Sequence, residues 1–264
     1  MIVLGIDTAT ESVSVAVVDG EEVLAAGESR SERRHAEDLT PMIESVVGSA
    51  GIVLGEVDAV AVDVGPGLFT GMRVGIASAQ ALAHVLSVPL VGVDGLEALV
   101  AAAPAFDGDL IVPTIDARRG QVAWALHRAD DWRDERNTGS GAATRSFRVA
   151  PAAVTALDDL TAALRERAQA CLFVGDFARR RREAIVESLG MVSWVVEFAS
   201  ANRGDTAEFP HARQVALIAH RRLLDGDTLS DAADNDPTRA APCVPALYLR
   251  EADAEINWTT RSNA

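Results

Sequence analysis

Hydrophobic and polar positions follow two different periods along the first hundred residues. The opening "MIVLGI" is apolar, and "SVSVAVVD" at residues 12–19 alternates small polar and apolar side chains, as a half-buried strand does. Asp19-Gly20 favours a hairpin into "VLAAGES". The pattern therefore predicts three meandering strands within residues 1–28.

The period then changes to that of a helix. In residues 35–51 the apolar side chains recur at helical spacing, and Pro41 lies either in a first turn behind Thr40 or inside a longer helix. These apolar positions are Leu39, Met42, Ile43, Val46 and Val47. Strands at 57–65 and 89–93 alternate with helices after residue 67 and at 94–103. Three strands followed by right-handed crossovers make an α/β layer.

A second unit is predicted from Leu110, where "DLIVPTIDARRGQVAWALH" gives a strand, a turn and a strand. The expected order beyond it is an exposed loop at 130–146, a helix at 151–170, a strand at 171–177, helices at 178–190 and 211–227, and a last strand at 246–253. Both units carry Ile-Asp between two strands, so they are either two copies of one unit or two ordinary hairpins.

The composition of the chain excludes several classes of function. The 264 residues are 48% hydrophobic, enough for one large domain or two small ones. The formal net charge is −15, so direct binding of nucleic acid by this chain alone is not expected. All 24 basic residues are arginine, which removes the lysine that a P-loop or a Schiff-base enzyme needs. The run Arg179–Arg182 is read as a solvated helix face rather than an RNA contact.

No targeting or metal signature stands out. No apolar run reaches the ~18 residues of a membrane span, and the N-terminus does not have the pattern of a signal peptide. Cys171 and Cys243 are read as free thiols of a cytoplasmic protein. No two of the five histidines have the spacing of two ligands on one helix face, so no metal site is predicted, and His35 is expected at the surface or in an interface.

Two aspartates could carry chemistry. Asp7 ends the first strand beside Thr8 and Thr10, and Asp116 takes the matching place in the second unit. Such a strand tip can position a phosphate or a metal-bound water. It can equally be a turn aspartate bonded to backbone N–H groups, and Glu11, whose charge would repel a phosphate, favours this second interpretation.

The turn Gly65-Pro66-Gly67 and the helix after it have the shape of a phosphate-binding element. However, small residues recur every fourth position on one face of that helix: Gly71, Gly75, Ala79 and Ala83. A bare face lets a neighbouring helix or sheet approach closely, and this packing interpretation is favoured over a phosphate cradle. Arg73 opposes the helix dipole and is expected to have a specific partner.

Five segments together resemble the TsaB (YeaZ) family: "IDTATESVSVAVVD", "HAEDLTPMIESVV", "GPGLFTGMRVGIASAQALA", "PLVGVDGLEAL" and "IDARRGQVAWAL". The resemblance implies an α/β fold of the actin, sugar-kinase and Hsp70 type (ASKHA) with a reduced second domain. It divides the chain into an N-terminal domain at 1–106, a second domain at 107–250 and a flexible tail at 251–264.

The resemblance also implies a function. TsaB proteins are non-catalytic and pair with a catalytic subunit, TsaD. With the ATPase TsaE, that complex places threonylcarbamoyl on adenosine 37 of tRNAs that read codons beginning with A. TsaB proteins also form homodimers, through the same kind of surface that binds TsaD. TsaD carries two metal-binding histidines where this chain has Gly95 and Leu99. No cofactor or catalytic residue is therefore expected, and tRNA would be met only through the complex.

The family's interface is a bundle of the first two helices. Carried over to this chain, it comprises His35, Leu39, Ile43, Val46, Val47, Phe69, Thr70, Gly71, Arg73, Gly75 and Ala79. Two rival functions are kept: a small ATPase or phosphotransferase using Asp7 and Asp116, and a nucleotide-sensing module without turnover.

Overall fold

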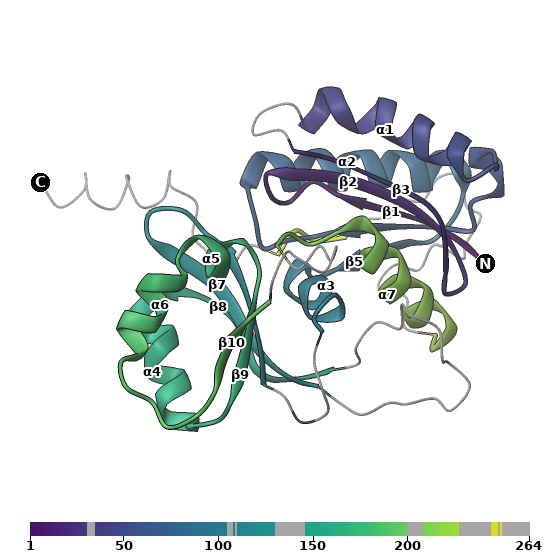
Figure 1. Ribbon diagram of the computed structural model, residues 1–264. Coiled ribbons are helices and arrows are strands. Elements are labelled where there is room, and N and C mark those ends of the chain that lie inside the picture. Colours follow the sequence, from purple (N-terminus) through teal and green to yellow (C-terminus); the bar gives the residue numbers. More distant parts are fainter. Residues whose placement is uncertain are drawn as a thin grey trace, which may run out of the picture.

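The computed structural model describes residues 1–30, 35–104, 108, 110–129, 146–199, 208–226, 244–247 and 249. Within them the chain forms two five-stranded sheets with helices packed on their faces (Figure 1). The mixed α/β class predicted from the sequence is confirmed. No helix in the described part of the chain is both long and apolar enough to cross a membrane.

The first sheet has the order β3-β2-β1-β4-β5. Its strands are β1 (Ile2–Asp7), β2 (Ser12–Asp19), β3 (Glu22–Arg30), β4 (Ala59–Asp63) and β5 (Leu90–Val93). The predicted meander of three strands is confirmed, and β1 then pairs in parallel with β4. This parallel pairing brings the carboxyl ends of β1 and β4 side by side, which positions the candidate site.

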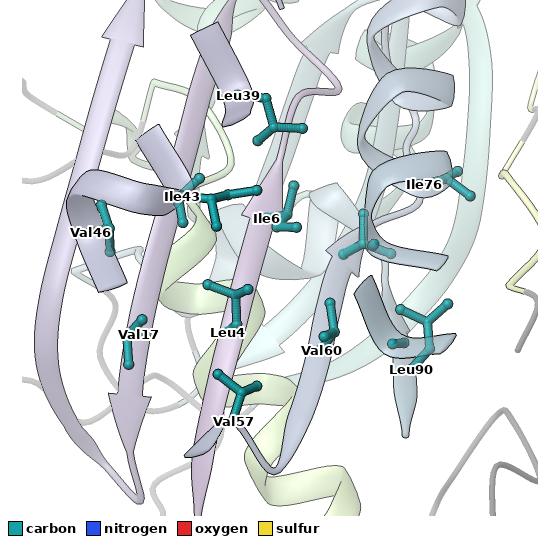
Figure 2. Packing of buried hydrophobic residues seen from close by; sticks show 14 of the residues in the cluster. Leu4, Ile6, Val17, Leu39, Ile43, Val46, Val57, Val60, Ile76 and Leu90 are labelled. Atoms are coloured by element: carbon teal, nitrogen blue, oxygen red, sulfur yellow. The ribbon is translucent and has the colours of Figure 1, made fainter. Parts of the chain in front are cut away.

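Helices cover both faces of the first sheet (Figure 1). They are α1 (His35–Ser49), α2 (Phe69–Leu86), α3 (Gly95–Ala101) and α7 (Ala212–Leu224), and a short 3-10 helix, η1 (Leu54–Glu56), precedes β4. Because side chains alternate along a strand, Leu4 and Ile6 face α1 and α2, whereas Val3 faces α3 and α7. Figure 2 shows Leu39 and Ile43 of α1 in the core with these strand residues.

The second sheet has the order β10-β9-β6-β7-β8. Its strands are β6 (Leu110–Asp116), β7 (Gln121–Ala129), β8 (Ser146–Ala156), β9 (Cys171–Val174) and β10 (Val196–Phe198). Read from β8, this is the strand order of the first sheet, with the same parallel and antiparallel pairings. The interpretation as two copies of one unit is therefore supported over two unrelated hairpins.

Three helices cover one face of the second sheet, and α3 packs on its other face. They are α4 (Leu157–Arg167), α5 (Asp176–Arg180) and α6 (Arg182–Leu189). Since α3 also contacts the first sheet through Ala98 and Ala101, it lies between the two sheets. Helix α7 follows the second sheet in the sequence but packs on β1, β2 and β4 of the first.

Three details of the structure differ from the prediction. Residues 151–156, predicted as helix, are the end of β8, because an edge strand tolerates Pro151. The helix predicted at 178–190 is two helices, broken at Arg181. The short strand β10 was not predicted. Pro41 lies inside α1, which is the second of the two positions expected for it.

Other predictions fall partly outside the described residues. This applies to the exposed loop at 130–146, to Cys243 and to the tail at 251–264. Of the last predicted strand, residues 246, 247 and 249 are described and are not in a strand, although Leu247 N donates a 2.7 Å hydrogen bond to Val64 O. The division of the chain near residue 106 stays a prediction.

Candidate functional site

Two neighbouring strands of the first sheet end in buried aspartates. Asp7 closes β1 and Asp63 closes β4, and both side chains are almost completely inaccessible to solvent. One oxygen of each is satisfied in a tight turn: Asp7 Oδ1 accepts from Ala9 N at 2.8 Å, and Asp63 Oδ1 accepts from Gly65 N at 2.7 Å. Asp7 is therefore bonded as a turn aspartate, the second of the two roles considered for it.

The two carboxyl groups titrate as a pair. Burial raises the pKa of Asp7 to about 7, and burial together with the charge of Asp7 raises the pKa of Asp63 well above its ordinary value. Their remaining oxygens, Oδ2 of each, are buried and have no hydrogen-bond partner. Because two buried carboxylates repel each other, we expect the pair to hold one proton near neutral pH.

The threonines after Asp7 tie the turn to the helices. Thr8 Oγ1 donates to Gly71 O at 2.7 Å, and Thr10 O accepts from His35 Nε2 at 2.7 Å. Both threonines are buried. Thr8 and Thr10, two of the residues proposed for a nucleotide site, thus link the turn after β1 to α2 and α1. His35 is buried within the chain rather than lying at its surface.

The matching site in the second unit is more exposed. Asp116 N donates to Asp176 Oδ1 at 2.9 Å, and Asp116 Oδ1 accepts from Arg118 N at 2.8 Å. Burial raises the pKa of Asp176 to about 6. A guanidinium lies near this pair, because Arg180 is 3.7 Å from Asp176 and 3.8 Å from Asp116.

An ion-pair cluster joins the turns that follow Asp7 and Asp116. Glu11 accepts from Arg118 Nη2 at 2.6 Å and from Arg180 Nη2 at 2.5 Å. The hydrogen bond from Arg180 is the largest cause that lowers the pKa of Glu11. The sequence does not indicate the partners of Glu11, because they lie 107 and 169 residues away along the chain.

The small residues of α2 face the chain's own sheet. A Cβ at Gly71 would lie 2.2 Å from Thr8 O, and a Cβ at Gly75 would lie 2.4 Å from Thr8 Oγ1. Ala79 is fully buried in the same core. The predicted close approach is real, but the neighbour is β1 and its turn, not another chain.

The apolar residues of α1 that were assigned to the interface are also in this core. They are Leu39, Ile43, Val46 and Val47. As packed, these side chains are at most 6% exposed. A partner surface on α1 and α2 would therefore consist of their outward positions.

The outward face of α2 carries a second stripe at four-residue spacing: Phe69, Arg73, Ala77, Ala81 and Val85. Phe69 is 50% exposed and Val85 79% exposed. The guanidinium of Arg73 stacks on the Phe69 ring, 3.8 Å from its centroid, which is the specific partner expected for it. Thr70 is also exposed.

Gly95 and Leu99, which the resemblance places where TsaD has histidines, are buried. Gly95 is the first residue of α3, where a Cβ would lie 2.6 Å from Asp63 Oδ2, and Leu99 is in the core between α3 and the second sheet. Neither offers a metal ligand. Among the described residues, no three side chains of His, Cys, Asp or Glu are grouped closely enough to hold a metal ion.

Comparison with known proteins agrees with this fold. The family model of TsaD, tRNA N6-adenosine threonylcarbamoyltransferase, matches residues 29–258. TsaB, the tRNA threonylcarbamoyladenosine biosynthesis protein of Bacillus subtilis, is 28% identical over 258 residues, which is 98% of each chain. The chain belongs to the TsaD family, in its TsaB (YeaZ) branch.

Other relatives match over part of their length. An uncharacterized protein of Mycobacterium tuberculosis is 42% identical over 127 residues, which is 47% of this chain and 58% of that protein. TsaB of Escherichia coli is 38% identical over 132 residues, 50% of this chain and 57% of that protein. The chain thus spans little more than half the length of several TsaB-branch relatives that it matches.

Solved structures show a similar fold. A Pseudomonas aeruginosa protein described as similar to peptidase YEAZ superposes with a TM-score of 0.68 at 25% identity, covering 94% of this chain and 99% of its own. The ROK hexokinase of Thermus thermophilus superposes with a TM-score of 0.50 at 14% identity, covering 85% of this chain and 100% of its own. The second likeness concerns the fold alone, and it agrees with the predicted ASKHA type.

Proposed function

We propose that this chain is a non-catalytic subunit of the machinery that forms threonylcarbamoyladenosine at position 37 of tRNA. It would act by binding and activating a TsaD-type catalytic subunit, together with a TsaE-type ATPase. The observation that carries the proposal is the full-length match to the TsaB protein of Bacillus subtilis. The net charge of −15 fits a subunit that meets tRNA only through its partners.

The non-catalytic role is supported by the strand tips. Asp7, the aspartate that the rival ATPase function needs, is fully buried and bonded to Ala9 N. Glu11 and its two arginines lie between the turns after Asp7 and Asp116. Gly95 and Leu99 supply no metal ligand where TsaD has histidines. The geometry gives no comparable support to the phosphotransferase.

We place the partner surface on the outward stripe of α2, defined above by its five residues. Ala77 and Ala81 let another helix approach closely, which is the role first given to Gly75 and Ala79. Phe69 and Arg73 form a stacked aromatic and guanidinium pair, the kind of anchor that dominates binding energy at interfaces. The same stripe would serve a homodimer, so partner binding and self-association should compete.

Substituting Ala77 with arginine tests this surface. Because Ala77 is exposed in the middle of the stripe, the fold should tolerate the change while a close-packed partner would not. Binding to a purified TsaD-type subunit, measured by calorimetry, should weaken at least tenfold, or about 1.4 kcal/mol. The matched control is Ala162→Arg on the exposed side of α4, which should leave affinity unchanged.

The measurement also tests the assignment of the helix face. Equal affinities for wild type and Ala77→Arg would place the partner elsewhere on the chain. A comparable loss in Ala162→Arg would show that added positive charge, not position, weakens binding. Circular dichroism of both variants checks that the fold is retained.

A further inference from the structure

The carboxylate of Glu11 is held in a geometry typical of a bound anion. Arg180 approaches both of its oxygens, Nη1 to Oε1 at 3.3 Å and Nη2 to Oε2 at 2.5 Å. Arg118 adds a third hydrogen bond to Oε1 at 2.6 Å. A guanidinium that contacts two oxygens of one group binds carboxylate and phosphate in the same way.

The three residues come from different parts of the fold. Glu11 lies in the turn between β1 and β2, Arg118 lies in the equivalent turn between β6 and β7, and Arg180 ends α5. The glutamate therefore reaches from the first unit to two guanidinium groups of the second. Its side chain is only 18% exposed although it lies in a turn.

The charges around Arg118 and Arg180 indicate that Glu11 keeps external anions away. Asp116 and Asp176 also face Arg180, but at 3.8 and 3.7 Å, beyond hydrogen-bonding distance. With Glu11 in place, three carboxyl groups face two guanidinium groups, and an external anion would be repelled. Without Glu11, the two aspartates balance the charges of the two arginines. The N–H donors of Arg118 and Arg180 that now bond to Glu11 would become available to an anion.

We propose that Glu11 is an internal ligand, which occupies an anion site formed by Arg118 and Arg180 and closes it to small phosphate-type anions. The site would keep the two equivalent turns together without any bound molecule. This inference concerns the residues of this chain and does not depend on the proposed function.

Removing the glutamate side chain should open the site. We expect Glu11→Ala to bind inorganic pyrophosphate at least tenfold more tightly than wild type in calorimetry at constant ionic strength. The double variant Glu11→Ala with Arg180→Ala should lose that gain. Glu22→Ala removes one negative charge from an exposed position of β3 and should behave as wild type.

Three results would overturn the proposal. They are equal affinity of wild type and Glu11→Ala, an equal gain in Glu22→Ala, and a gain that persists without Arg180. If Glu11→Ala fails to fold, Glu11→Gln keeps the size of the side chain and removes its charge. Glu11→Gln should also bind pyrophosphate more tightly than wild type, though with a smaller gain than Glu11→Ala. An affinity equal to that of wild type would refute the proposal that Glu11 is an internal ligand.

Discussion

Replacing Gly71 with alanine is expected to lower the free energy of unfolding by about 3 kcal/mol. The new methyl group would lie 2.2 Å from the carbonyl oxygen of Thr8, a backbone atom that cannot rotate away. The 2.7 Å hydrogen bond from Thr8 Oγ1 to Gly71 O would be disturbed at the same point. Urea denaturation followed by circular dichroism measures the change.

Gly48→Ala is the matched control for this prediction. Gly48 also lies in a helix, but it is exposed and a Cβ there meets nothing within 4 Å. Alanine should therefore raise stability by about 0.5 to 1 kcal/mol, because it reduces the backbone entropy of the unfolded chain. Similar effects at both positions would mean that α2 does not approach Thr8 as described.

The same geometry affects how interface experiments are designed. Leucine at Gly75 would enlarge a residue whose Cβ position already lies 2.4 Å from Thr8 Oγ1. If such a variant no longer dimerised, the cause would be damage to the chain's own core and not the loss of a contact between two chains. Substitutions on the outward stripe of α2 avoid this ambiguity.

Replacing Asp7 with asparagine is expected to stabilise the protein at pH 8 and to remove a pH dependence. Burial raises the folded-state pKa of Asp7 from 3.8 to about 7. A raised carboxyl pKa means that the folded state holds the proton on Asp7 more tightly than the unfolded state does. The stabilisation of the folded state by this proton is complete below about pH 4 and is lost as the pH rises to about 7. At about 1.4 kcal/mol per pKa unit, the loss is roughly 4 kcal/mol.

Asparagine keeps the acceptor for Ala9 N and offers an N–H group to Asp63 without a charge. The stability difference between Asp7→Asn and wild type should therefore grow between pH 4 and pH 7 in favour of the variant. The control, Asp159→Asn at an exposed position of α4, should show no such growth. A constant difference across this range would contradict the shared proton.

The sequence predicted the elements whose periodicity is strong. The alternation in β2 and the apolar spacing of α1 need no tertiary information. The Ala-rich end of β8 has no clear period, so its sequence alone does not distinguish a strand from a helix. Asp7 was noticed but its partner Asp63 was not, because their contact depends on the parallel pairing of β1 with β4.

The stripe of small residues shows a second limit. Spacing at Gly71, Gly75 and Ala79 indicates a close neighbour but does not say which neighbour, because a sheet of the same chain and a helix of another chain need the same bare face. Only the fold shows that Thr8 and β1 occupy it. The sequence does not single out the outward stripe with Ala77 and Ala81, because the inner stripe, with its glycines, has the stronger pattern.

Reconstitution of tRNA modification tests the central claim most directly. Purified TsaD-type and TsaE-type proteins are incubated with tRNA, ATP and the threonylcarbamoyl donor, with and without this chain, and threonylcarbamoyladenosine is measured by mass spectrometry of the digested tRNA. The account predicts modification only when the chain is present, unchanged activity with Ala162→Arg, and strongly reduced activity with Ala77→Arg. Full modification without the chain, or ATP turnover by the chain alone that Asp7→Asn abolishes, would contradict it.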